Sequence, residues 1–148
     1  MVSDMSIKQL SVFIENREGR LEDVLQVLRN NEVNIVSLSL ADTNEFGMLR
    51  MLVNNPEAGY NALKRNGFSA KLTDVLVIKL SHRIGMLQEL LLAICEEHIN
   101  IEYVYALSTG KDDASIVLKT SNLDVAEKTL RAKGVGIVTP EEIQGMQA

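Results

Sequence analysis

Apolar residues in the first half of the chain follow two different periods in turn. Leu10, Val12 and Ile14 occupy every second position, which predicts a strand with one buried face. The next apolar positions have the i, i+3, i+4, i+7 spacing of an amphipathic helix, and they are Leu21, Val24, Leu25 and Leu28. Residues 35–41 and 48–53 are then predicted to form two strands that flank a polar turn at 42–44.

A second helix in this half is marked at both of its ends. Asn55 is a favourable N-cap, and Pro56 fits the first helical position, where no backbone N–H is needed. Gly67 is typical of the residue that follows a helix C-terminus. Residues 68–72 alternate again and predict a closing strand, so the order of elements is βαββαβ.

The second half of the chain repeats the first. A shift of 66 residues aligns Arg17-Glu18-Gly19 with Arg83-Ile84-Gly85, and Val33-Asn34-Ile35 with Ile99-Asn100-Ile101. With one extra residue in the second copy, the match extends over about 70 residues twice. The repeat predicts strands at 75–80, 101–107, 114–119 and 135–138, a helix through 87–94, and a helix from Ser121 or Asn122 to Lys133. We expect two modules, 1–73 and 74–148, the latter with a short helical tail from Thr139.

Right-handed crossovers determine the fold class that this order predicts. Two β-α-β connections per module place both helices on one face of a four-stranded antiparallel sheet, which is a ferredoxin-like α+β fold. The residues expected to be buried between helices and sheet are Leu21, Leu25, Leu28, Leu87, Leu91 and Ile94. The strand at 35–41 carries apolar residues on both faces, so we expect a partner to cover the second face, most simply in a twofold homodimer.

Composition and charge restrict the function. The formal net charge is −5, from 15 basic and 20 acidic residues, which argues against nucleic acid as a partner. The single cysteine, Cys95, excludes an intrachain disulfide, and no apolar run is long enough for a membrane span, so we expect a cytoplasmic protein. The sequence contains no Ser/His/Asp set, no carboxylate pair and no phosphate-binding glycine loop. We therefore predict a protein that is not an enzyme and that has no metal site and no cofactor.

The repeated motif resembles a known family. A strand is followed by a polar residue, a glycine and a helix, and an apolar-Asn-Ile segment then leads into the second strand; this pattern looks like the ACT domain. The resemblance covers both halves and is similar to standalone tandem ACT proteins. It implies a regulator of amino-acid metabolism that binds a free amino acid or small carboxylic acid between modules, with residues matching Asn16 and Asn34 in contact with the ligand.

The residues themselves are suited to such a ligand. Gly19 and Gly85 lie where a strand turns into a helix, so a carboxylate can approach the first helical N–H groups. We expect the helix between Asn16 and Asn34 to bring both amides to the same edge of the sheet. The second copy keeps Asn100 but has His82 in place of Asn16. The family often has Pro before the glycine, whereas this chain has Glu18 and Ile84, so the two sites are predicted to be unequal.

Plainer interpretations exist for the same residues. Gly19 and Gly85 can be helix-entry glycines alone, and Asn34 and Asn100 can be left-handed or turn-forming residues after a helix. Arg17 and Arg83 are interpreted as solvated loop charges, and Cys95 as a small core residue. Two functions stay open: a sensor of an amino acid or carboxylate, or a docking subunit of a metabolic enzyme with a vestigial ligand site.

Overall fold

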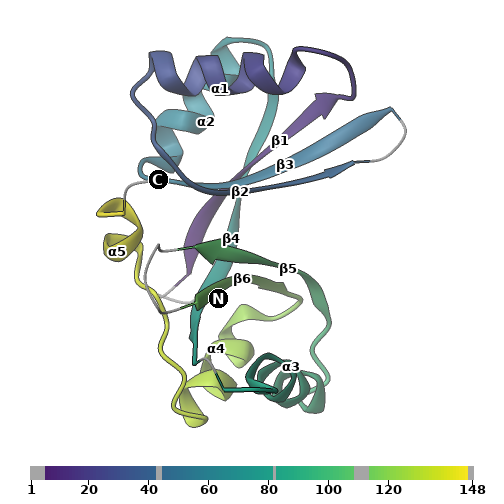
Figure 1. Ribbon diagram of the computed structural model, residues 1–148, viewed down its shortest axis with the longest axis vertical. Helices are drawn as coiled ribbons and strands as arrows, with labels where there is room; N and C mark the ends of the chain where they lie inside the picture. Colours follow the sequence, from purple (N-terminus) through teal and green to yellow (C-terminus); the bar gives the residue numbers. More distant parts are fainter. Residues whose placement is uncertain (1–5, 43–44, 82, 109–113, 147–148) are drawn as a thin grey trace. The chain divides into compact units, whose positions relative to one another are not determined.

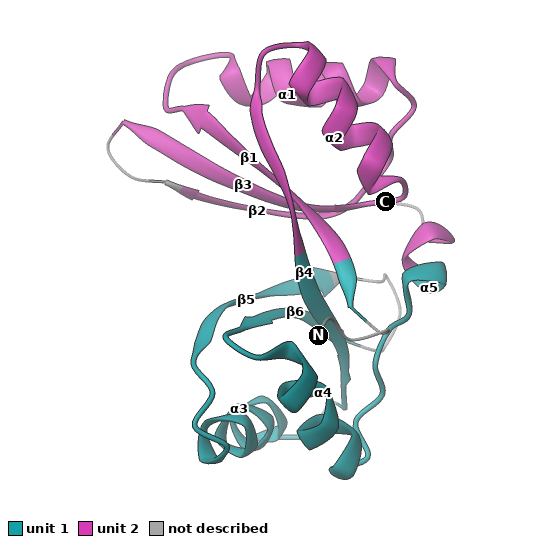
Figure 2. Ribbon diagram, turned by 180° about the vertical axis from the view of Figure 1, so that it is seen from behind, with its two compact units in different colours: residues 1–7, 74–142 teal, residues 8–73, 143–148 magenta. Residues whose placement is uncertain are grey.

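The computed structural model describes residues 6–42, 45–81, 83–108 and 114–146 (Figure 1). The chain forms two compact units, of which Lys8–Thr73 make up most of one and Asp74–Glu142 most of the other (Figure 2). We call them the N-terminal module and the C-terminal module. The elements are β1 (Ile7–Glu15), α1 (Arg20–Asn30), β2 (Ile35–Asp42), β3 (Phe46–Val53), α2 (Pro56–Arg65), β4 (Ser69–Leu80), α3 (Met86–Glu96), β5 (Ile101–Ser108), β6 (Ala114–Thr120), α4 (Leu123–Ala132) and α5 (Pro140–Gln144).

The N-terminal module has the predicted ferredoxin-like arrangement. Its strands follow the order β2-β3-β1-β4, and β3 pairs antiparallel with both β1 and β2. Both helices, α1 and α2, cover one face of this sheet (Figure 1). Alternate residues of β1 and β3 face the helices and form the core with Val24, Leu28 and Leu63.

The C-terminal module repeats this arrangement with a shorter last strand. Its strand order is β4-β6-β5, and α3 and α4 lie on one face (Figure 1). The strand predicted at 135–138 is reduced to an isolated antiparallel bridge between Ile78 and Ile137, held by hydrogen bonds from Lys79 N to Gly136 O and from Val138 N to Val77 O, both 2.8 Å. The two strands predicted at 68–72 and 75–80 are one continuous strand, β4.

Helices α2 and α4 begin and end as the sequence predicts. The side chain of Asn55 accepts a hydrogen bond from Ala58 N at 3.2 Å, and Asn122 accepts from Val125 N at 3.2 Å. Asn122, not Ser121, is therefore the N-cap of α4. Gly67 and Gly134 follow the helix ends with φ of +83° and +77°, a conformation that glycine adopts without steric cost.

Helices α1 and α3 end on residues other than glycine. Glu32 and His98, at matching positions of the repeat, have φ of +57° and +59°. Asn34 and Asn100 lie two residues further on and are not among the positive-φ residues, so the left-handed interpretation of these asparagines is wrong. The turn needs a left-handed residue, and Glu32 and His98 fill that place instead.

The predicted core is correct for its centre and wrong for its margin. Leu28 and Ile94 are fully buried. Leu21, Leu25 and Leu91 are only half-buried, and Leu87 is 39% exposed. Leu21 and Leu91 still pack against the core clusters of their modules, so the prediction fails fully only for Leu87, which lies largely at the surface. On the sheet faces away from the helices, Leu52 and Val117 are fully buried, so these faces are apolar as expected.

The helical tail predicted from Thr139 is present as α5. Thr139 and Glu142 form a capping box, in which Glu142 N donates to Thr139 Oγ1 and Thr139 N donates to Glu142 Oε1, both at 3.1 Å. The hydrogen bond from the Thr139 backbone and the nearby Lys79 ammonium lower the pKa of Glu142 below its usual value.

The contrast between centre and margin gives a stability prediction. Leu28→Ala empties a fully buried site and should lower the free energy of unfolding by about 2–5 kcal/mol. Leu87→Ala removes a side chain that is 39% exposed and should cost less than about 1 kcal/mol. Urea denaturation followed by circular dichroism measures both, and equal losses would contradict the assigned positions.

Candidate functional site

Each module has a glycine turn between its first strand and first helix. Gly19 and Gly85 are the N-cap residues of α1 and α3, with φ of +87° and +82°, and no side chain caps either helix. A Cβ added to either glycine would meet no atom within 4 Å, so the space above each turn is open. The positive φ explains why glycine is needed, and the open space leaves the uncapped helix start accessible to an anion.

The two turns differ in charge. Near Gly19 the chain has three carboxylates, Glu18, Glu22 and Asp23, and Asp23 accepts a hydrogen bond from Arg20 at 3.2 Å. In the first turn of α3 the one acidic residue is Glu89, which is held by Arg83. A bound carboxylate would therefore meet less repulsion at Gly85 than at Gly19.

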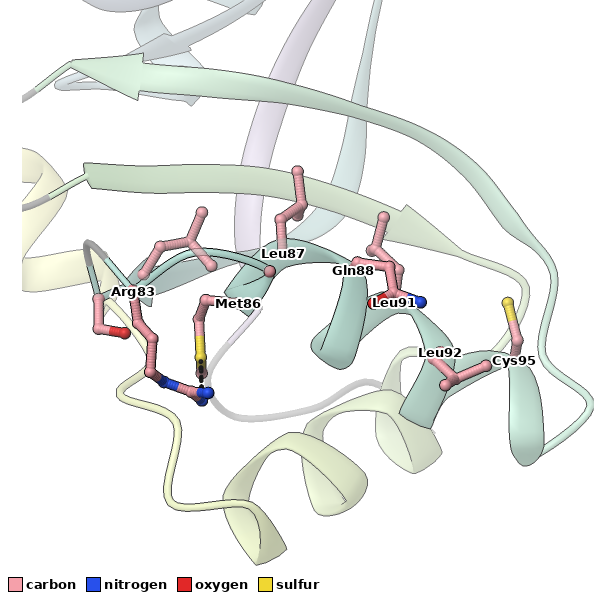
Figure 3. A pocket seen from close by; sticks show the side chains of 10 residues that line it. Arg83, Met86, Leu87, Gln88, Leu91, Leu92 and Cys95 are labelled. Atoms are coloured by element: carbon pink, nitrogen blue, oxygen red, sulfur yellow. Dashed lines mark hydrogen bonds between the residues drawn. The ribbon is translucent and has the colours of Figure 1, made fainter.

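A groove begins at the Gly85 turn and follows α3 (Figure 3). Its volume is about 770 Å³. The polar residues Ser81, Arg83 and Gln88 lie toward the start of the helix, and the remaining lining is apolar apart from the thiol of Cys95. The full lining is Leu80, Ser81, Arg83, Gly85, Met86, Leu87, Gln88, Leu91, Leu92 and Cys95. Cys95 is exposed, so its assignment to the core is wrong.

Arg83 is fixed at the mouth of this groove. Its guanidinium donates to both carboxylate oxygens of Glu89, at 3.1 and 2.9 Å, and to the sulfur of Met86 at 3.1 Å (Figure 3). The hydrogen bond and charge of Arg83 lower the pKa of Glu89, and those of Glu89 raise the pKa of Arg83. Three of the five guanidinium N–H donors are used in these bonds, which leaves two for a ligand.

The predicted pair of asparagines does not lie at one edge of the sheet. Glu15, next to Asn16, pairs with Phe46, whereas Ile35, next to Asn34, pairs with Val53. Phe46 and Val53 are the two ends of β3, about 23 Å apart at roughly 3.3 Å per residue. Asn16 and Asn34 of one module therefore cannot contact one small ligand. The prediction failed because a crossover makes the flanking strands parallel, so the end of one and the start of the next lie at opposite ends.

The same separation holds in the C-terminal module. Leu80, before the Gly85 turn, pairs with Ala114, and Ile101, after Asn100, pairs with Thr120. Ala114 and Thr120 end β6, about 20 Å apart at roughly 3.3 Å per residue. Gly85 and Asn100 of one module are thus also at opposite ends of the sheet.

Asn34 and Asn100 take part in a backbone clasp that occurs in both modules. Asn34 N donates to the side-chain oxygen of Asn54 at 2.8 Å, and Asn54 N donates to Asn34 O at 3.0 Å. Asn100 N donates to Ser121 Oγ at 3.1 Å, and Ser121 N donates to Asn100 O at 2.9 Å. The clasp uses only the backbone of the two asparagines, so their side-chain amides do not contribute to it.

Of the other predicted site residues, Asn16 lies in the described part of the chain and His82 does not. Asn16 is exposed at the end of β1, and its N–H donates to Glu45 O at 2.8 Å. His82 lies outside the described residues. Arg17 and Arg83, interpreted as loop charges, are exposed but paired, Arg17 with Glu15 at 2.9 Å and Arg83 with Glu89 at 2.9 Å.

Other site residues escaped the sequence analysis. The pairing of Arg83 with Glu89, the clasp residues Asn54 and Ser121, and the apolar flank of α3 were not predicted. A signal for the flank exists, because α3 has apolar residues at every position from Leu90 to Cys95, more than one buried face needs.

Two other features, a metal-binding cluster and a membrane-spanning helix, are not found in the described part of the chain. Within residues 6–42, 45–81, 83–108 and 114–146, no group of three or more His, Cys, Asp or Glu side chains is placed to hold a metal ion. None of the described helices is both long and apolar enough to cross a membrane.

A family model described as an ACT domain pair matches residues 5–147. The chain belongs to the ACT domain family. Protein BT0572 from Bacteroides thetaiotaomicron is 34% identical, with a TM-score of 0.89 over 96% of this chain and 98% of that one. The ligand-free regulatory subunit of aspartate kinase from Thermus thermophilus is 18% identical, with a TM-score of 0.64 over 90% and 95% of the two chains, and shares the fold. The search of curated proteins gave no match.

Family membership confirms the resemblance and the tandem ferredoxin-like fold. It also supports a regulatory, ligand-binding role for the ACT pair rather than a catalytic one. The two ACT modules thus have the same backbone arrangement at the clasped asparagines. They differ in the side chains at their surfaces, such as those that line the groove at Gly85.

The clasp predicts which side chains of the ACT modules stabilise the fold and which are available to a ligand. Asn54→Ala or Ser121→Ala removes one hydrogen bond and should lower the free energy of unfolding by about 0.5–1.5 kcal/mol. Asn34→Ala and Asn100→Ala retain the clasp and should change the free energy of unfolding by less than about 0.5 kcal/mol. Urea denaturation measures all four variants, and a large loss in Asn34→Ala would assign its side chain to the fold.

Proposed function

We propose that the protein is a non-catalytic regulator that binds a free amino acid or small carboxylic acid at the Gly85 turn. The observation that carries this proposal is the groove that opens at an uncapped helix start beside Arg83. The ligand carboxylate would accept hydrogen bonds from the N–H groups of Leu87 and Gln88 in the first turn of α3 and from the two remaining donors of Arg83. The N–H of Met86, the first residue of α3, already donates to Arg83 O at 3.2 Å. The rest of the ligand would extend over Met86 and Leu87.

A second copy of the chain would complete this site. Asn100 of the same module is about 20 Å away along the sheet, at roughly 3.3 Å per residue, which is too far for one small ligand. If β5 pairs antiparallel with β5 of a second copy, the start of the partner's strand lies beside the end of this one. Ser108 at that end pairs with Ala114, as Leu80 does, so the partner's Asn100 would lie at the level of the Gly85 turn.

The N-terminal module offers a weaker version of the same site. Asn16 and Gly19 of one copy would be completed by the partner's Asn34 through the corresponding strand β2. The carboxylates of Glu18, Glu22 and Asp23 oppose an anionic ligand there. We infer that the C-terminal site is the tighter one.

One observation favours the second function, a docking subunit of a metabolic enzyme. Phe13 and Phe46 stack with their ring centroids 4.9 Å apart, and they are 46% and 38% exposed. Such an exposed aromatic pair is typical of a protein contact. The docking function needs no ligand at Gly85, so a rise in melting temperature on adding a ligand distinguishes the sensor from the docking subunit.

The sensor proposal predicts a thermal shift. Among the twenty amino acids and common aromatic and branched carboxylic acids, at least one should raise the melting temperature, since a ligand at 100 times its dissociation constant adds about 2.7 kcal/mol of stability. Gly85→Asp places an anion at the carboxylate position and should abolish the shift.

The repeat supplies a control for backbone strain. Gly134 has a similar φ of +77° and equally open surroundings, but it lies at the far end of a helix. Gly134→Asp should be destabilised like Gly85→Asp and yet keep the ligand shift. If no compound shifts the wild type, or if Gly85→Asp responds normally, the docking function is favoured.

A further inference from the structure

We propose that the ligand of the Gly85 groove is an aliphatic carboxylic acid without an α-amino group, whose alkyl chain extends along α3 toward Cys95. This inference rests on the proposed function, because it takes the carboxylate position at the Gly85 turn from it. It goes further by choosing between the two ligand classes, amino acid and carboxylic acid, and by naming the residues that determine the choice.

The charges at the groove favour a ligand that has a carboxylate and no ammonium group. Of the described residues that line it, Arg83 is the one that carries a charge, and none is acidic. Glu89 lies in the first turn of α3, but both of its carboxylate oxygens accept hydrogen bonds from Arg83, at 3.1 and 2.9 Å. The α-ammonium group of a free amino acid would meet a fixed cation there, and like charges repel. A carboxylic acid without the amino group avoids this repulsion.

The groove is longer than an amino-acid side chain. Its lining follows α3 from Gly85 to Cys95, about 15 Å at a rise of 1.5 Å per residue (Figure 3). An extended chain advances roughly 1.2 Å per bond, because a peptide backbone of three bonds per residue spans about 3.3–3.6 Å. Leucine, with four bonds from its carboxyl carbon to its tip, thus covers about 5 Å, or one helical turn. A straight-chain acid of about ten carbons would approach Cys95.

Beyond the first helical turn the groove offers apolar surface to such a chain. Leu87, Leu91 and Cys95 recur every four residues and form one row along α3, and Leu92 adds to the lining (Figure 3). Leu87 and Leu92 are 39% and 50% exposed, so an alkyl chain that covers them removes apolar surface from water. A ligand with a carboxylate at one end and an alkyl chain at the other matches both parts of the groove.

The repeat restricts this inference to the C-terminal module. At the positions that match Leu92 and Cys95, α1 has Gln26 and Arg29. An alkyl chain laid along α1 would take the Arg29 guanidinium out of water without a partner for its charge, which costs free energy. The position of Gln88 is occupied by Glu22 in α1, whose carboxylate repels an acid.

Hexanoate and norleucine test the choice of ligand class, because norleucine is hexanoate with an α-amino group. Isothermal titration calorimetry on the full-length protein should give a dissociation constant about tenfold lower for hexanoate, the factor that corresponds to about 1.4 kcal/mol. From butanoate through hexanoate to octanoate, each added methylene should lower the dissociation constant about two- to fourfold, the upper value corresponding to about 0.8 kcal/mol per buried methylene.

A matched pair of variants tests whether the chain lies on α3. In Leu92→Gln the gain from hexanoate to octanoate should disappear, because a polar side chain replaces the apolar surface beyond the first turn. Leu38→Gln changes a leucine of β2 that is exposed to a similar extent, 47%, and lies outside the groove, so this variant should keep the gain.

The single cysteine reports directly whether the chain reaches the far end of the groove. Cys95 is exposed, so a maleimide should label it in the unliganded protein. Decanoate at 100 times its dissociation constant should slow the labelling by more than about tenfold, since about one site in a hundred is then empty. Butanoate at the same saturation is too short to reach the thiol and should leave the labelling rate unchanged.

Four results would overturn the proposal. They are norleucine binding as tightly as hexanoate, no gain from added methylenes, decanoate that does not protect Cys95, and labelling of the unliganded protein that slows as its concentration rises, which would assign the groove to a second copy. If amino acids bind the wild type and not Gly85→Asp, the proposed regulator stands and only the ligand class is wrong. If neither amino acids nor carboxylic acids bind, both proposals fail.

Discussion

The parallel direction of the strands on either side of a crossover helix is the constraint from which the arrangement of this molecule follows. It keeps both helices of a module on one face of the sheet. It also separates the glycine turn that ends one strand from the asparagine that starts the next, by about 20 Å in the C-terminal module at roughly 3.3 Å per residue. No ligand of amino-acid size spans that distance. Within one module the polar residues of the repeated motif therefore cannot hold one such ligand together.

The internal repeat acts as a comparison within one molecule. Both modules use a left-handed glycine before the first helix, a left-handed Glu32 or His98 after it, and a backbone clasp onto Asn34 or Asn100. These devices satisfy backbone groups and are independent of any ligand. The surfaces built on them differ in part: Leu21 and Leu25 of α1 match Leu87 and Leu91 of α3, but α1 has Arg20, Gln26 and Arg29 where α3 has Met86, Leu92 and Cys95. We infer that the modules share a fold and have separate tasks.

Much of the fold could be predicted from the sequence because hydrophobic period and helix-capping residues are local signals. Asn55 and Pro56 predict the start of α2, and Gly67 predicts its end, as the structure has them. Local signals do not determine which side of a helix is covered, so Leu87 and Cys95 were wrongly placed in the core. The site was predicted in part. The glycine turns depend on local geometry, whereas the positions of Asn16 and Asn34 depend on strand direction, which spacing along the chain does not reveal.

Subunit exchange tests most directly whether one ligand site spans two chains. Gly85→Asp chains and Asn100→Ala chains are each expected to lose binding of the compound that gives the largest melting shift. In a mixed dimer, one site combines the intact Gly85 of one chain with the intact Asn100 of the other. Equilibrium dialysis of the exchanged mixture should recover about a quarter of the wild-type sites, because half of the dimers are mixed and each has one intact site of two. Heterodimers that form and bind nothing, or an Asn100→Ala protein that binds as the wild type does, would contradict the account.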